Sequence, residues 1–422
     1  MLTTVAVSGY RSLRDVVVPL HDLDVVTGAN GTGKSSLYRS LRLLAGCGRG
    51  DAIGTLAREG GLQSALWAGP ASLDAARRRG YAVQGTVRRG PVSLRLGFAS
   101  DDWSYLVDLG LPQQGADAAG SSAFLRDPEI KREVVWSGPV MRPGSVVARR
   151  RWGTVEVRTG EGAEVARPDE WETDRPAGWE SDPEPESEAG VQPQRGWTRL
   201  TQSLRPWESM LTELADPERA PELLRVRRLI AGWRFYDGFR ADPDAPARRQ
   251  QVGTRTPVLA DDGSDLAAAL QTIRESGRAA LDAAVADAFD GATVAVPVVD
   301  GRFDVHLHQP GMLRPLSAAE LSDGTLPYLC LVAALLTVDP PPLLVLNEPE
   351  TSLHPDLLPP LARLIAEAST RSQVMVVSHS ETLARALGDR ATRVTLVKDI
   401  GETFVEGQGL LTTPAWNWGS RR

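Results

Sequence analysis

Near its N-terminus the chain reads Gly28-Ala29-Asn30-Gly31-Thr32-Gly33-Lys34-Ser35, followed by Ser36, which fits every position of the phosphate-binding pattern Gly-x-x-x-x-Gly-Lys-Ser/Thr. Glycines let backbone N–H groups turn toward phosphate oxygens, and the lysine adds a charge at the β- and γ-phosphates. The hydroxyl of Ser35 is a ligand type that Mg²⁺ accepts. This stretch therefore predicts a site for a nucleoside triphosphate with Mg²⁺.

The residues on both sides of this loop support the prediction. Leu23 to Thr27 is a short apolar strand, and Ser35 to Leu44 carries leucines at helical spacing. A helix that starts directly after the loop directs its positive N-terminus at the same anion. A chance glycine-rich turn would not need this strand–loop–helix context.

A second polar cluster follows an apolar strand near the other end of the chain. Leu343-Leu344-Val345-Leu346 runs into Asn347-Glu348, so a buried strand ends in two polar side chains. Glu348 can accept a proton from, or orient, a water that attacks the γ-phosphate. Asn347 keeps a carbonyl oxygen for the Mg²⁺ side but lacks a carboxylate charge, so we expect weaker Mg²⁺ binding or slower turnover.

Two further motifs lie close in sequence to this strand. The strand Val374 to Val377 ends in Ser378-His379-Ser380, which places a histidine where ligand sites gather, at the carboxyl end of a strand. Ser322-Asp323-Gly324-Thr325 comes directly before an apolar helix and offers a hydroxyl and open N–H groups to an anion. The alternatives are a structural histidine and an ordinary capped turn.

Composition favours an intracellular protein. Of the 422 residues, 24% are charged and 42% apolar, and Cys47 and Cys330 are the only cysteines, as in a reducing compartment. The longest apolar stretch, 326–346, is interrupted by Asp339-Pro340-Pro341-Pro342. We therefore expect a cytoplasmic protein with no membrane span. The net charge of −7 comes from residues 161–190, which hold eleven acidic and two basic side chains.

The middle of the chain lacks these motifs. Residues 67–159 contain several β-rich runs, and residues 160–197 are rich in Pro, Glu, Gly and Asp, which predicts a flexible acidic loop. Helical spacing returns at about 205–231 and 264–289, followed by expected strands at 293–299 and 303–307. Neither stretch repeats a heptad pattern over many turns, so we expect no long coiled coil.

Together the motifs resemble the ABC type of ATPase head, in the branch of the RecF and SMC proteins and the overcoming-lysogenization-defect family. The bacterial predicted AAA family ATPases without a nuclease domain are the most similar group. The resemblance implies an α/β fold: an ABC-type P-loop ATPase head with a mixed β-sheet core and an inserted β-rich and helical region. The implied domains are 1–66 with 230–410 as the head, 67–159 as a β-rich lobe, 160–197 as the loop and 198–230 as a helical arm.

The resemblance also implies roles for individual residues. Gly28 to Ser36 would be Walker A, Asn347-Glu348 the Walker B end, and His379 the switch histidine, with Glu348 and His379 catalytic. Ser322, Asp323, Gly324 and Thr325 would be the signature, acting on the nucleotide of a partner copy. Arg11 and Ser12 would approach the nucleotide, and Ser35, Asn347 and Gln63 would serve the metal. Phe235-Tyr236-Asp237 and the Glu348–Pro355 stretch, which includes a D-loop, are also similar to this group.

The function implied is an ATPase with ATP and Mg²⁺ as cofactors, whose head-to-tail homodimer forms on ATP binding. It would act on DNA or a partner protein in repair or phage defence, with any effector on another chain. The alternative, motivated by Asn347, is a slow or non-hydrolysing ATP-clamped scaffold that recruits a separate effector. The sequence favours an ATPase over a P-loop kinase or GTPase, because neither of those enzymes would need the signature or His379.

Arginine clusters bear on the DNA question. They are Arg77-Arg78-Arg79, Arg88-Arg89, Arg149-Arg150-Arg151, and Arg225 with Arg227 and Arg228. Such clusters contact phosphate backbones in DNA-binding proteins, and elsewhere they are solvated surface charge.

Overall fold

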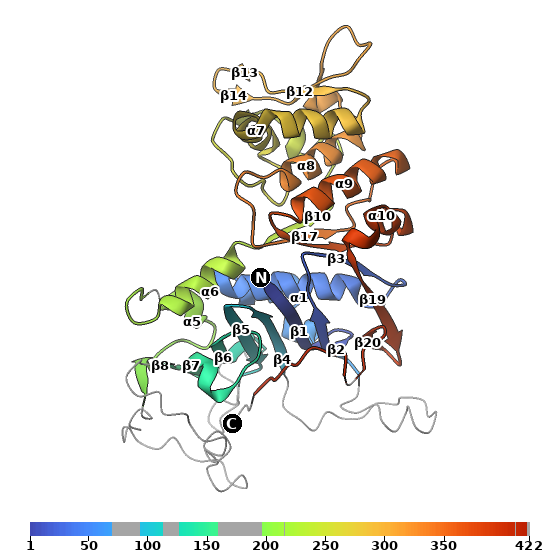
Figure 1. Ribbon diagram of the computed structural model, residues 1–422. Coiled ribbons are helices and arrows are strands. Elements are labelled where there is room, and N and C mark those ends of the chain that lie inside the picture. Colours follow the sequence, from blue (N-terminus) through green and yellow to red (C-terminus); the bar gives the residue numbers. More distant parts are fainter. Residues whose placement is uncertain (70–92, 113–125, 159–195, 215, 410, 420–422) are drawn as a thin grey trace. The chain divides into compact units, whose positions relative to one another are not determined.

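The computed structural model describes residues 1–69, 93–112, 126–158, 196–214, 216–409 and 411–419 (Figure 1). It divides the chain into two compact units. The first unit comprises Met1–Pro19, Arg39–Ala231 and Lys398–Arg422, and the second comprises Leu20–Tyr38 and Gly232–Val397. The acidic segment 161–190 and the arginines at 77–79 and 88–89 lie outside the described residues.

The first unit contains an eight-stranded sheet in which every neighbouring pair is antiparallel. Its order is β2-β1-β4-β5-β6-β7-β8-β9. The strands are β1 (Leu2–Tyr10), β2 (Leu13–Pro19), β4 (Leu94–Ser100), β5 (Trp103–Gly110), β6 (Glu129–Ser137), β7 (Val146–Arg151), β8 (Thr154–Arg158) and β9 (Trp197–Thr201).

Short helices complete the first unit. They are α2 (Ala52–Arg58), α3 (Leu62–Ala65), η1 (Pro143–Ser145), α5 (Met210–Glu213) and α6 (Pro221–Ala231), and the strand β20 (Glu402–Val405) lies beside β2. Helix α6 packs on β5 and β6 through Leu223, Val226 and Ile230, which share one face at helical spacing.

The predicted helical arm was 198–230, and the prediction is wrong for its first residues. Residues 197–201 form β9, because Trp197 and its neighbours pair with β8 at the edge of the sheet. The grouping of residues 1–66 with 230–410 also differs from the compact units. Strand β1 pairs with β4, so backbone hydrogen bonds join the N-terminus to the β-rich region.

A buried ion pair lies in the first unit, between Glu133 on β6 and Arg150 on β7. Both side chains are fully buried, and Arg150 Nη1 lies 2.9 Å from Glu133 Oε2. Tyr105 and Ser209 also donate to Glu133 Oε1, at 2.6 and 2.5 Å. For Arg150, the predicted DNA contact and surface charge are therefore both wrong: its charge is balanced inside the unit.

The second unit is built on a parallel sheet, with neighbouring strands in the order β10-β17-β18-β3-β19. The strands are β3 (Leu23–Thr27), β10 (Arg234–Asp237), β17 (Leu343–Asn347), β18 (Gln373–Val377) and β19 (Thr392–Asp399), the last two residues of which belong to the first unit. Every residue of β3, β17 and β18 is buried, which explains their continuous apolar sequences. The expected strands at 23–27, 343–346 and 374–377 are thus confirmed.

One large apolar core joins this sheet to α8 (Thr325–Leu335), α9 (Leu358–Ala368) and α10 (Glu381–Leu387), while α7 (Leu266–Ala288) packs on α8 and α9 (Figure 1). The unit also contains the first turn of α1 (Lys34–Arg49) and the short turns η3 (Pro246–Arg248), η4 (Ala318–Glu320), η5 (Pro355–Leu357) and η6 (Gly388–Arg390). Ten consecutive residues of α8, from Leu326 to Leu335, are buried. Helix α7 has a kink at Gly277, whose backbone is not helical.

Small antiparallel strands form two further sheets in this unit, β11-β14-β13 and β12-β15-β16. Their bounds are β11 (Gln251–Val252), β12 (Thr293–Ala295), β13 (Val298–Val299), β14 (Arg302–Phe303), β15 (His306–His308) and β16 (Leu316–Ser317). The single strands expected at 293–299 and 303–307 are wrong, because each stretch divides between the two sheets. Pro297, which has no N–H to donate, separates β12 from β13.

Candidate functional site

The phosphate loop connects β3 to α1 in the second unit, as predicted. Gly28, Gly31 and Gly33 all have positive φ angles, of 145°, 77° and 103°. At Gly28 a side chain would also overlap the carbonyl oxygen of Leu396 on β19. Glycine is therefore required at position 28 by backbone conformation and by space together.

Lys34 lies inside this loop. Its Nζ donates to the carbonyl oxygens of Gly28 at 2.6 Å and Ala29 at 3.0 Å, and the residue is 3% exposed. Burial lowers the pKa of Lys34, and the nearby Glu348 carboxylate opposes that shift. Ser35 is exposed at the start of α1, and Thr32 closes the turn with a 2.9 Å hydrogen bond to the Ala29 carbonyl.

The predicted catalytic residues lie at the same edge of the sheet as the loop. Strands β17, β18 and β3 are parallel neighbours, so their carboxyl ends meet at one edge. Glu348 follows β17, His379 follows β18, and Gly28 follows β3. The structure thus brings the phosphate loop to the same edge as Glu348 and His379, which lie more than 300 residues further along the chain.

Glu348 and His379 contact each other directly. His379 Nε2 lies 2.8 Å from Glu348 Oε1, and both side chains are more than a third exposed. Glu348 has a left-handed backbone, with φ of 50°, and its N–H donates to the Val377 carbonyl at 2.7 Å. A non-glycine residue held in this conformation is a common feature of functional sites.

Glu350 holds the segment that carries His379. Its Oε1 accepts from the Ser378 hydroxyl at 2.6 Å and from the backbone N–H groups of His379 and Ser380 at 2.9 and 3.1 Å. Hydrogen bonds to a carboxylate are stronger than those between neutral groups. The second glutamate of the Glu-Pro-Glu sequence therefore fixes the backbone on which His379 stands.

Asn347, at the end of β17, is 9% exposed and donates through Nδ2 to Asp237 Oδ1 at 2.6 Å. Asp237 is the last residue of β10, which pairs with β17 in parallel register. The Asn347 Oδ1 atom is buried and has no hydrogen-bond partner among the described residues. A carbonyl oxygen in that position fits a cation or a cation-bound water.

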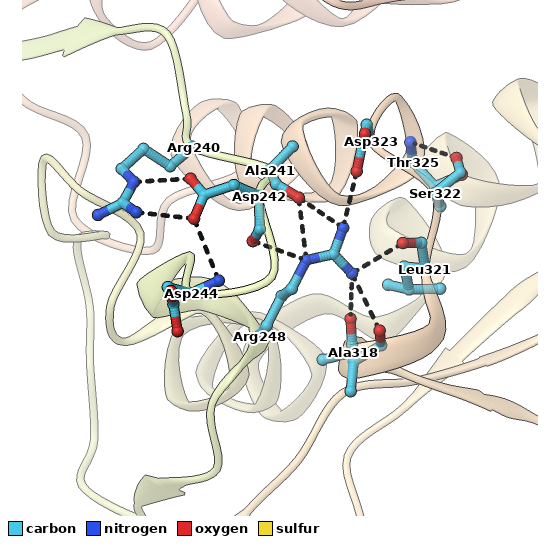
Figure 2. A network of polar contacts seen from close by, with 11 residues as sticks. Arg240, Ala241, Asp242, Asp244, Arg248, Ala318, Leu321, Ser322, Asp323 and Thr325 are labelled. Atoms are coloured by element: carbon cyan, nitrogen blue, oxygen red, sulfur yellow. Dashed lines mark hydrogen bonds and ion pairs between the residues drawn. The ribbon is translucent and has the colours of Figure 1, made fainter.

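The predicted signature turn lies between η4 and α8 of the same unit (Figure 2). Ser322 and Asp323 are exposed. The Ser322 hydroxyl accepts from the Thr325 N–H at 3.1 Å and lies 2.8 Å from the Thr325 hydroxyl, so the turn also caps α8. Gly324 lies close to Ser352, because an added Cβ would be 3.3 Å from the Ser352 carbonyl oxygen.

The guanidinium of Arg248 binds the residues of this turn and those just before it (Figure 2). Its Nη1 donates to the carbonyl oxygens of Ala318, Ala319 and Leu321 at 3.0, 3.2 and 2.8 Å. Its Nε and Nη2 donate to the Ala241 carbonyl, and Nη2 lies 3.0 Å from Asp323 Oδ1. The Arg248 side chain is 8% exposed whereas that of Asp323 is 81% exposed. A rigid guanidinium thus joins η3 to the turn through several carbonyls at once.

Arg11, Ser12 and Gln63 belong to the first unit. Arg11 pairs with Glu59 at 3.2 Å, and the Ser12 hydroxyl accepts from Thr403 at 2.8 Å. Gln63 is exposed on α3. The roles predicted for these three residues at the nucleotide and the metal stay predictions.

Sequence reasoning assigned no role to Asp237, Glu350 or Arg248. Asp237 and Glu350 both carry a local signal, since each is a carboxylate at or just beyond the end of an apolar strand. Arg248 has no such signal, because its partners are backbone carbonyls about 70 residues further along the chain.

The described residues meet neither the requirements of a protein-only metal site nor those of a membrane-spanning helix. Within them, no three or more His, Cys, Asp or Glu side chains gather as a protein-only metal site would require. Magnesium held with a nucleotide needs few protein ligands, because phosphate and water supply the others. Across the same residues, no helix is both long enough and apolar enough to cross a bilayer.

A P-loop at the edge of a parallel sheet, next to strands that are followed by a glutamate and a histidine, defines this chain as a P-loop ATPase. The chain belongs to the family described as "AAA domain, putative AbiEii toxin, Type IV TA system", which matches residues 159–385, more than half of its length. Membership of this family implies ATP binding and ATP hydrolysis.

No curated protein sequence matches the chain. Among solved structures, an SMC head bound to the C-winged helix domain of ScpA is similar over 96% of both chains, with 14% identity and a TM-score of 0.46. The SMC head domain from Thermotoga maritima is 12% identical over 96% of this chain and 97% of that one, with a TM-score of 0.39. An SMC head from Pyrococcus furiosus is 13% identical over 96% and 95%, with a TM-score of 0.45.

Proposed function

We propose that this protein is an Mg²⁺-dependent ATPase that uses ATP to join two copies of itself head to tail, and that this switch acts on DNA or on a separate effector protein in phage defence or repair. The observation that carries the proposal is the meeting of Glu348, His379 and the phosphate loop at one edge of a parallel sheet.

The phosphate loop would hold the triphosphate. Backbone N–H groups of residues 28–36 would face the phosphates, with Lys34 and the exposed Ser35 hydroxyl on the β- and γ-phosphate side. The contacts of Lys34 Nζ with two loop carbonyls support this role, because they keep the ammonium within the loop. Magnesium would supply charge at the phosphates, next to Ser35 and Asn347.

Glu348 would orient the attacking water and accept its proton. His379 lies 2.8 Å from that carboxylate, and it would restrict the rotation of the carboxylate and contact the γ-phosphate. Glu350 supports this arrangement, since it fixes the backbone at residues 378–380. Arg11 and Ser12 are proposed to approach the nucleotide and Gln63 to serve the metal, as the resemblance implies, and residues 1–66 with 230–410 are proposed to act as one functional head.

The signature turn would complete the site of a second copy. Ser322 and Asp323 are exposed, which a contact in trans requires, and the turn starts a helix whose N-terminus favours an anion. A two-fold pairing of heads would then use each turn once and each phosphate loop once. Hydrolysis removes the γ-phosphate contacts and would release the pair.

Size-exclusion chromatography with ATP and Mg²⁺, on wild type and Glu348→Gln, tests the proposal. We expect dimers with ATP, longer-lived dimers for Glu348→Gln, and turnover that falls roughly 100-fold or more in the variant because the general base is lost. Duplex DNA added to the same columns reports whether the dimer engages nucleic acid.

The alternative predicted from sequence, an ATP-clamped scaffold, gives a different result. It predicts ATP-driven dimers with equally low turnover in wild type and Glu348→Gln. Ser322→Arg separates both from a purely structural turn: we expect it to abolish dimers while ATP binding is retained. Loss of ATP binding in that variant would contradict the role in trans.

A further inference from the structure

Asp237 and Asn347 form a pair at the active edge of the sheet. Strands β10 and β17 run in parallel, and these two residues are register partners at the ends of the strands. The Asn347 Nδ2 atom lies 2.6 Å from Asp237 Oδ1. Asp237 is exposed, whereas Asn347 is 9% exposed.

This hydrogen bond fixes the orientation of the Asn347 amide. A carboxylate only accepts hydrogen bonds, so the nitrogen of the amide must face Asp237 and the oxygen must face away. That oxygen, Oδ1, is buried and has no hydrogen-bond partner among the described residues. Burial of an unpaired carbonyl oxygen is costly, so this atom favours a partner that can reach it, and a water, a cation or a cation-bound water can serve.

The pair also explains why asparagine stands at position 347. An aspartate there would bring two carboxylates within hydrogen-bond distance of each other, and like charges this close repel strongly. Because Asp237 stands at the end of β10, a neutral asparagine is favoured over aspartate at the end of β17. One negative charge is kept, on the neighbouring strand.

We propose that Asp237 supplies the metal-side negative charge of this ATPase, and that Asn347 is its neutral partner, holding the Mg²⁺ ion or its water through Oδ1. The inference rests on the proposed function, because it assigns a residue to the Mg²⁺ of that same site. It predicts that a charge swap between the two positions preserves magnesium binding.

The test measures the affinity for the fluorescent nucleotide mantATP, in EDTA and in a titration of MgCl₂. It compares wild type, Asp237→Asn, and the double variant Asp237→Asn with Asn347→Asp. We expect the Mg²⁺ enhancement of affinity to fall about tenfold in Asp237→Asn and to return to within threefold of wild type in the swap. Asp389→Asn, which removes another exposed aspartate charge, in η6, is the control and should leave the enhancement unchanged.

The outcomes separate the two proposals. An Asp237→Asn variant with the wild-type Mg²⁺ enhancement overturns the assignment of Asp237, and so does a swap as weak as the single variant. Melting temperatures in EDTA show that the variants are folded. A wild-type chain that binds no mantATP overturns the proposed function, and this inference with it.

Discussion

The signature turn and the strand-tip edge belong to the same compact unit, yet they are held in different ways. The carbonyls of residues 318, 319 and 321 are all paired with Arg248, whose side chain is 8% exposed (Figure 2). At the edge, by contrast, Asn347 Oδ1 and Glu350 Oε2 are buried with no partner among the described residues, and Glu348 has a left-handed backbone.

The difference indicates that the turn and the edge have different functions. A turn with internal partners keeps its shape without a ligand, as a surface that must meet a second molecule requires. An edge with unpaired polar atoms and backbone strain costs stability unless a ligand compensates. Variants of the turn should therefore change stability and pairing of the chains, while variants of the edge should change nucleotide chemistry.

Arg248→Ala should have the largest effect on stability. It removes the donor for the backbone carbonyls of residues 241, 242, 318, 319 and 321 and leaves them poorly paired. We therefore expect a loss of about 3 kcal/mol in the free energy of unfolding. ATP-driven dimers should weaken at least about tenfold while ATP affinity stays within about twofold. Urea unfolding and size-exclusion chromatography measure both, with the exposed Arg249→Ala as control. A free energy of unfolding that is unchanged in Arg248→Ala would contradict the role of Arg248 in holding the turn.

Gly28→Ala should be next in size, at about 2 kcal/mol, because the new Cβ meets the Leu396 carbonyl and the φ of 145° is unfavourable for alanine. Gly31→Ala is the matched control. Its φ of 77° is also strained, but nothing lies within 4 Å of the added Cβ, so about 1 kcal/mol is expected. Thermal melting and mantATP binding report the two effects. Equal losses in both variants would exclude the steric part of the explanation.

Glu350→Gln should cost about 1 kcal/mol, since an amide oxygen accepts the same three hydrogen bonds more weakly than a carboxylate. We expect turnover to fall about five- to tenfold, because His379 stands on the loosened segment. Glu367→Gln, exposed on α9, removes the same charge elsewhere. Steady-state ATP hydrolysis is the measurement, and wild-type turnover in Glu350→Gln would show that this segment needs no such support.

Asp323→Asn should have the smallest effect on stability, below about 0.5 kcal/mol, because its side chain is 81% exposed and such ion pairs contribute little. Comparison of this variant with Arg248→Ala shows whether the hydrogen bonds of Arg248 to the carbonyls or its ion pair with Asp323 holds the turn. A loss comparable to that of Arg248→Ala in chemical unfolding would assign the turn to the ion pair instead.

The sequence pattern was sufficient to predict those features whose chemistry depends on residues that are neighbours in the chain. The phosphate loop needs its glycines, lysine and serine in one run, and the strands 23–27, 343–346 and 374–377 are apolar because both faces are buried. Their order in the chain and their polar ends were enough to nominate Glu348 and His379.

Long-range pairing was not readable in the same way. The strand at 197–201, the division of 293–299 between two sheets, and the burial of Arg150 against Glu133 all depend on partners distant in sequence. The contact of Asp237 with Asn347 and the clamp of Arg248 on residues 318–321 are of the same kind. Local sequence sets which residues can donate, accept or turn, but the partner that each one meets is set by packing, which only the folded chain defines.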